Sequence, residues 1–128
     1  MRLDESGAVA LLDGRLCGTG APELLRTRHL RRDPRCSLFV FGPHPHWVGL
    51  DTKAAIAEGP DVAPRLARLM QARHGAAAPA GMVLGHDEAV GHDRLFGFDE
   101  YVEYARGQGR LLYEFDVRRA YGNYREDA

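Results

Sequence analysis

The chain has little of several residue types that would by themselves suggest a function. Among its 128 residues are two cysteines, one tryptophan and a single lysine, Lys53. Cys17 and Cys36 are too few for a disulfide framework, and we expect two free thiols in apolar surroundings. The only serines, Ser6 and Ser37, do not lie in the turn that carries the nucleophile of a serine hydrolase. These scarcities exclude a disulfide-rich scaffold and argue against serine-based catalysis.

Long apolar runs and excess charge are also missing. No apolar stretch approaches the roughly 20 residues that cross a bilayer, and residues 1–5 do not resemble a secretory signal, so we expect a cytoplasmic protein without a membrane partner. The formal net charge is −1, which argues against bulk attraction to nucleic acid. The sequence contains no phosphate-binding loop motif. With 45% hydrophobic residues, we expect one globular domain over residues 1–128.

A stretch near the N-terminus has the clearest local pattern. A turn of small residues at 18–20 is followed by Pro22, which suits the first turn of a helix because proline lacks a backbone N–H. Pro34 disfavours helical geometry in the residue before it, so the helix should end near Arg32. The apolar residues 36–41 then predict a strand. We therefore expect a strand, a short helix and a second strand in succession.

The expected helix is rich in arginine. Arg28, Arg31, Arg32 and Arg35 recur at helical spacing and most of them share one face, whereas Arg26 points elsewhere, toward the helix start. Free N–H groups at a helix start attract anions, and a guanidinium can bind a phosphate with two hydrogen bonds. The spacing alone favours a plainer alternative, a solvated basic face beside a structural turn.

The rest of the chain predicts further strands and two more helices. The expected elements are a hairpin at 7–20 around Asp13-Gly14, a strand at 47–57, an amphipathic helix at 62–74 with Arg65, Arg68 and Arg73 on its wet side, a mobile surface loop at 76–97, a helix at 98–106, and strands at 110–116 and 119–124. Strands interrupted by single helices favour an antiparallel barrel over a doubly wound sheet.

The run 26–38, Arg-Thr-Arg-His-Leu-Arg-Arg-Asp-Pro-Arg-Cys-Ser-Leu, resembles a segment of the pyridoxamine 5′-phosphate oxidase-like proteins, Lys-x-Arg-Asn-Leu-Arg-x-Asp-Pro-Arg-Val-Ser-Leu. These are split β-barrel proteins that bind flavin or deazaflavin. Residues 13–20 are similar to a hairpin strand of that family, 46–51 to a later strand, and 109–122 to its closing hairpin. The resemblance implies a mainly β, α+β fold: a dimeric split antiparallel β-barrel with two to three short helices.

The same resemblance implies a function and a site. The protein would bind FMN or the deazaflavin factor 420 in a groove at the interface of a homodimer, and would act as an oxidoreductase on a small organic substrate. Thr19, Gly20, Leu25 and Arg26 would form the phosphate site, with Arg26 in the place of the phosphate-binding lysine or arginine. Trp47 corresponds to a position beside the isoalloxazine ring. The cofactor would carry the chemistry, and no catalytic side chain is assigned.

Two alternatives stay open. Family members have a further strand or hairpin before the segment that matches 7–20, and no such pattern precedes it here. This would leave a sheet edge for a partner to cover, and would suit a non-catalytic barrel that has lost its cofactor. His44 and His46 share one face of an extended segment, a spacing that suits a metal or haem. A polar loop with two surface imidazoles explains them more simply, so no metal site is assigned.

Overall fold

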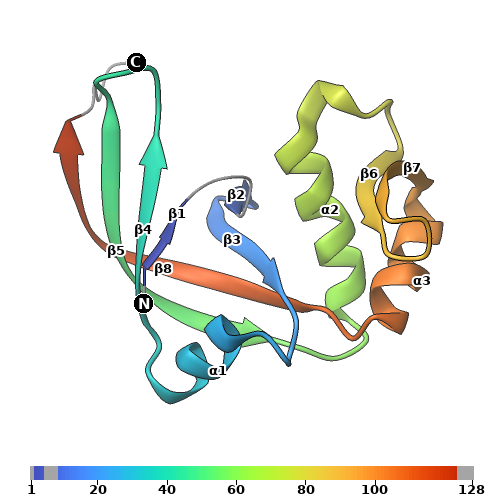
Figure 1. Ribbon diagram of the computed structural model, residues 1–128, viewed down its shortest axis with the longest axis horizontal. Helices are drawn as coiled ribbons and strands as arrows, with labels where there is room; N and C mark the ends of the chain where they lie inside the picture. The colour runs from blue at the N-terminus through green and yellow to red at the C-terminus, as the bar shows by residue number, and fades with distance from the viewer. Residues whose placement is uncertain (1, 5–8, 124–128) are drawn as a thin grey trace.

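The computed structural model describes residues 2–4 and 9–123 (Figure 1). Its strands are β1 (Arg2–Asp4), β2 (Val9–Leu12), β3 (Arg15–Gly20), β4 (Arg35–Phe41), β5 (Trp47–Ala57), β6 (Met82–Asp87), β7 (His92–Gly97) and β8 (Leu111–Asn123). Its helices are α1 (Leu25–Arg32), α2 (Val62–His74), α3 (Phe98–Gly107) and a 3₁₀ turn, η1 (Gly75–Ala77). Among the described residues, no helix has both the length and the apolar character needed to cross a membrane.

Six strands form one sheet in the order β1-β4-β5-β8-β3-β2, and β6 and β7 form a separate hairpin. All pairings in the sheet are antiparallel except that of β1 with β4. The long strands β4, β5 and β8 run together on one side of the molecule, whereas α2, α3 and the β6–β7 hairpin pack at the other end (Figure 1). The expectation of a mainly β fold with up to three short helices is confirmed.

Two apolar clusters form the core, and β8 connects them. The larger cluster fills the space between α2, α3 and the hairpin, and includes Leu66, Leu69, Val83, Phe96 and Leu112. The smaller lies under the main sheet against α1, and includes Leu30, Leu38, Tyr113 and Phe115. Leu112 and Tyr113 face different clusters because neighbouring side chains of a strand point in opposite directions. One strand therefore contributes to both halves of the core.

The first two helices agree closely with the sequence prediction. Helix α1 ends at Arg32, directly before the Asp33-Pro34 pair. Helix α2 spans the predicted residues, and Gly75 follows it with φ of 52°, a conformation that glycine adopts readily. Of the three arginines expected on the wet side of α2, Arg68 is exposed and Arg65 and Arg73 are half-buried, with the Nε atom of Arg73 buried.

The segment expected to be a mobile loop is mostly a β-hairpin. Residues 82–87 and 92–97 pair antiparallel, which places His86 opposite Asp93 and Asp87 opposite His92. The repeated Gly-His-Asp triplets of the sequence therefore lie on facing strands. The inward positions of β6 are Val83, Gly85 and Asp87. Since only one of the three is a large apolar residue, the alternation that normally indicates a strand is hidden.

The last strand and the first strand also correct the expectations. β8 is continuous from Leu111 to Asn123, so the predicted interruption between two strands is wrong. Its register with β5 shifts between Asp51 and Thr52, which face Arg119 and Val117 respectively, so that Arg118 is bulged out. β1 pairs with residues 37–39 of β4. A strand therefore does precede the first hairpin, contrary to the expectation, and it covers part of the edge of β4.

Candidate functional site

The end of β3 and the start of α1 are held together by buried polar contacts. Gly20 is buried, and a Cβ atom there would overlap the hydroxyl group of Tyr113. Thr27, which is fully buried, donates its hydroxyl proton to the carbonyl oxygen of Ala21 at 2.7 Å and is hydrogen-bonded to the hydroxyl of Tyr113. Because a threonine hydroxyl has one proton, Tyr113 is the donor in the second bond. These bonds fix where α1 begins relative to β8.

Two arginines meet at Thr19, the penultimate residue of β3. Arg26 donates from Nη2 to the carbonyl oxygen of Thr19 at 3.1 Å, and Arg110 donates from Nη2 to its hydroxyl oxygen at 3.5 Å. The Nε atoms of both arginines are buried, and neither has a hydrogen-bond partner within the described chain. A buried donor without a partner costs free energy, which a bound oxyanion would recover. Arg26 and Arg110 therefore fit a phosphate or carboxylate group.

The other arginines of α1 do not join this site. Arg28 is exposed, and Arg31 makes a two-pronged ion pair with Glu58 at 3.0 and 3.4 Å. Leu25 is also directed to solvent, with 63% of its surface exposed. Of the residues predicted for the phosphate site, Thr19, Gly20 and Arg26 come together, and Leu25 stands at the start of the helix beside them.

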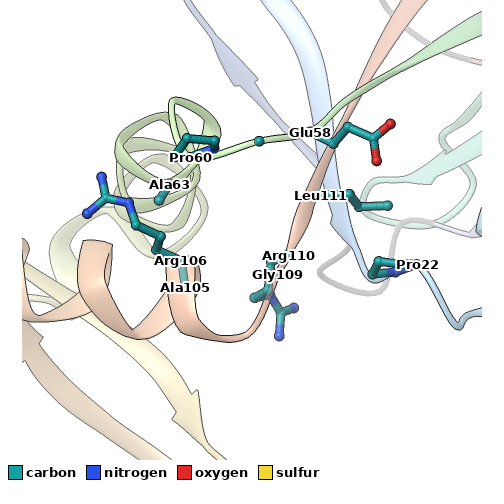
Figure 2. A pocket seen from close by; sticks show the side chains of 10 residues that line it. Pro22, Glu58, Pro60, Ala63, Ala105, Arg106, Gly109, Arg110 and Leu111 are labelled. Atoms are coloured by element: carbon teal, nitrogen blue, oxygen red, sulfur yellow. The ribbon is translucent and has the colours of Figure 1, made fainter.

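A cleft of about 480 Å³ opens next to this site (Figure 2). It is bounded by Pro22, by the connection from β5 to α2, and by the end of α3 with the loop that follows; its remaining lining residues are Glu58, Gly59, Pro60, Ala63, Ala105, Arg106, Gly109, Arg110 and Leu111. Arg110 thus touches both the cleft and Thr19. The volume lies within the range of small-molecule sites, about 300–1,000 Å³.

Trp47 lies at the opposite end of the sheet. It pairs with Asn123 at the far end of β8, whereas Gly20 pairs with Leu111 at the near end. At roughly 3.3 Å per residue the two positions are on the order of 35–40 Å apart along the strand. Trp47 packs against Phe39 and Tyr121, with ring centroids 6.3 and 6.2 Å away. Within one chain, Trp47 therefore does not meet the other predicted site residues.

The remaining candidate groups show no catalytic arrangement in the described residues. His44 is exposed, and His46 is half-buried with an Nδ1 atom that has no partner there. The described part of the chain contains no cluster of three His, Cys, Asp or Glu residues that could hold a metal ion. Cys17 and Cys36 are buried free thiols, as expected, and burial raises the pKa of each. A thiol with a raised pKa is a poor nucleophile at neutral pH.

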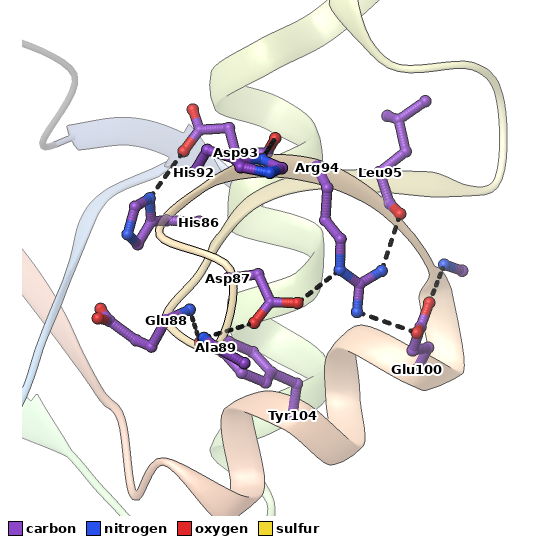
Figure 3. A network of polar contacts seen from close by, with 11 residues as sticks. His86, Asp87, Glu88, Ala89, His92, Asp93, Arg94, Leu95, Glu100 and Tyr104 are labelled. Carbon is purple, nitrogen blue, oxygen red and sulfur yellow. Dashed lines mark hydrogen bonds and ion pairs between the residues drawn. The ribbon is translucent and has the colours of Figure 1, made fainter.

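An ion-pair network on the hairpin had no counterpart in the sequence predictions (Figure 3). Arg94 of β7 donates to Asp87 at 2.6 Å and to Glu100 of α3 at 3.1 Å. The hydrogen bond from Arg94 holds the pKa of both carboxyl groups below their ordinary values. The Arg94 guanidinium also lies over the ring of Phe96, 3.7 Å from its centroid. The network connects the hairpin to α3. In the sequence, only the repeated Gly-His-Asp triplets could have drawn attention to this segment.

No family model matches the chain, and no curated protein matches it. Solved structures do. The conserved hypothetical protein Rv2991 of Mycobacterium tuberculosis superposes with a TM-score of 0.61 at 19% identity, over 89% of this chain and 63% of that one. The chain has a split β-barrel fold. A candidate pyridoxamine 5′-phosphate oxidase of Listeria innocua has a TM-score of 0.50 at 14% identity, covering 88% of this chain and 72% of its own. The fold thus agrees with the sequence resemblance, and this split barrel spans less than two thirds of the length of the mycobacterial protein.

Proposed function

We propose that this split barrel is an oxidoreductase that binds FMN or the deazaflavin factor 420 and acts on a small organic substrate. The observation that carries the proposal is the pair of guanidinium groups at Thr19. Arg26 and Arg110 have spare, buried donors that suit the phosphate group shared by both cofactors. The bound flavin or deazaflavin would supply the redox chemistry, by accepting or donating a hydride or electrons.

The protein's own residues would bind and orient the cofactor. Arg26 would hold the phosphate, and its bond to the carbonyl of Thr19 fixes the direction of its guanidinium. The tight contact between Gly20 and Tyr113 would keep the end of β3 rigid beneath the phosphate. The adjoining cleft of about 480 Å³ would admit the rest of the ligand or the substrate.

The proposal includes a homodimer. Trp47 lies too far from Arg26 to touch the same flavin from one chain, so a ring contact with Trp47 requires a second chain. The end of β4, the start of β5 and the end of β8 lie side by side, at the end of the sheet away from α2 and α3 (Figure 1). Apolar groups are exposed on these strands: Phe41 at the end of β4 is 58% exposed, and Val117 in the middle of β8 is 44% exposed. Burying these groups against a second copy would favour association.

The test is a titration of the purified full chain with FMN and, separately, with factor 420, followed by cofactor fluorescence. The wild-type protein should bind at least one of them with micromolar affinity. Arg26→Gln should weaken binding tenfold or more, since a hydrogen bond to a charged group contributes about 1.5–3 kcal/mol. Arg28→Gln is the matched control, because Arg28 lies on the same helix but is exposed. If a well-folded wild-type protein binds neither cofactor, the proposed oxidoreductase function is contradicted and the alternative of a non-catalytic barrel is favoured.

A further inference from the structure

A second cavity lies on the other side of Thr19, between α2, α3 and the β6–β7 hairpin. Its volume is about 170 Å³, and its polar lining includes Thr19, Arg73, His74, His86, Tyr101 and Arg110. A water molecule occupies about 30 Å³ in the liquid, so the cavity has room for a phosphate group with a few attached atoms. It is too small for a flavin. The chemistry of its walls therefore has to be explained separately from the proposed cofactor site.

Two arginines share this cavity without a carboxylate partner. Neither Arg73 nor Arg110 forms an ion pair with any residue that the structure describes, and the Nε atoms of both are buried without a hydrogen bond there. Burial lowers the pKa of Arg73, and the nearby charge of Arg110 lowers it further. Burying like charges together is unfavourable unless an opposite charge joins them.

The one acidic side chain in the wall, Asp93, raises the pKa of Arg73 but forms no ion pair with either arginine. Asp93 is paired with His86, whose Nδ1 atom lies 3.1 Å from its Oδ1 atom, and 62% of the Asp93 side chain is exposed to solvent. Its charge is therefore largely screened by water. The hydroxyl of Thr19 accepts a hydrogen bond from Arg110, so its own proton is available to a ligand. The cavity offers a surplus of positive charge and of hydrogen-bond donors.

We propose that this cavity is a binding site for a small phosphate, either the free ion or a small phosphate monoester, held by Arg73 and Arg110. The planar guanidinium groups can each donate two hydrogen bonds to a phosphate, and the hydroxyl of Thr19 can donate a further hydrogen bond. The site shares Thr19 and Arg110 with the proposed flavin phosphate site, whereas Arg73 belongs to it alone. It connects to that site through Thr19, whose carbonyl faces Arg26 and whose hydroxyl faces Arg110.

Isothermal titration calorimetry of the full chain with inorganic phosphate, at constant ionic strength, tests the proposal. Glycerol 3-phosphate forms a second arm, and tighter binding of it would identify a monoester as the preferred ligand, whereas tighter binding of inorganic phosphate would identify the free ion. Arg73→Gln should weaken binding of either ligand tenfold or more. Arg68→Gln is the control, because Arg68 is on the same helix, exposed, and paired with Asp13. No binding by the wild-type chain, or equal losses in both variants, would overturn the proposal.

Thermal unfolding separates a ligand role from a structural one. Without phosphate, Arg73→Gln should melt at or above the wild-type temperature, because it removes a half-buried charge whose Nε atom is buried without a partner among the described residues. Phosphate should raise the melting temperature of the wild type but not of this variant. Arg26→Gln should keep the response to phosphate, and Arg73→Gln should keep the affinity for flavin. Loss of the phosphate response in Arg26→Gln would instead place the ion at the proposed cofactor site and contradict a second one.

Discussion

The ring of Tyr113 occupies the space that a side chain at position 20 would need. Gly20 is the last residue of β3, and its backbone passes directly against the Tyr113 hydroxyl. That hydroxyl is also bonded to Thr27 of α1. The absence of a side chain at Gly20 therefore lets a strand, a helix and the central strand β8 meet, beside the arginines that converge on Thr19.

We expect Gly20→Ala to destabilise the protein. The added methyl group must displace a buried tyrosine that is hydrogen-bonded, and overpacking of this kind costs about 1–3 kcal/mol. Urea unfolding followed by circular dichroism measures the loss. Gly107→Ala in α3 is a matched control, because a Cβ atom there meets nothing within 4 Å. It should be neutral or stabilising, and equal destabilisation by both variants would contradict the close-packing argument.

The Arg94 network predicts a pH dependence of stability. The pKa values of Asp87 and Glu100 are lowered in the folded state by hydrogen bonds from Arg94. Such carboxylates stabilise the fold fully at pH values above their ordinary pKa, near 4. Their contribution to the free energy of unfolding is lost as the pH falls through their lowered pKa values in the folded state. Arg94→Gln should therefore lower the unfolding midpoint at pH 7 more than at pH 3.

The control for this experiment is Arg106→Gln, which removes an exposed pair with Glu103 on α3. Exposed pairs of this kind contribute little, so its midpoint should change only slightly at either pH. A loss from Arg94→Gln that is the same at pH 3 and pH 7 would show that the guanidinium acts by packing on Phe96 and not through the two carboxylates.

The sequence predicts those helices and strands whose apolar spacing or flanking residues match their environment in the folded protein. The apolar spacing of residues 62–74 predicts α2 because that face packs on the core, and the Asp33-Pro34 pair marks the end of α1 for steric reasons. The β6–β7 hairpin was missed because tertiary contacts determine its inward residues. Gly85 makes room for the ring of Tyr101, and Asp87 is buried against Arg94.

The site is predictable only in part, for a related reason. Thr19, Gly20 and Arg26 are close in sequence, so a local motif can indicate them together. Arg110 reaches Thr19 across a separation of 91 residues, and no local pattern connects them. Helical spacing assigned Arg73 to solvent because an arginine is normally exposed, and it could not show that Arg73 lines a cavity together with the β6–β7 hairpin.

Mixed dimers distinguish a flavin site shared between two chains from a site within one chain. Arg26→Gln and Trp47→Leu chains, carrying different affinity tags, are produced together, and dimers that contain one of each are purified by both tags. These are titrated with whichever of FMN and factor 420 binds the wild type more tightly. If Arg26 of one chain and Trp47 of the other form each site, a mixed dimer contains one doubly altered site and one unaltered site.

We expect each variant alone to bind the cofactor weakly, whereas the mixed dimer should bind one cofactor per dimer with wild-type affinity. Sedimentation and circular dichroism of the parent variants confirm that they are folded and paired. A mixed dimer without any site of wild-type affinity, or a Trp47→Leu protein that binds as well as the wild type, would contradict a flavin site shared between two chains.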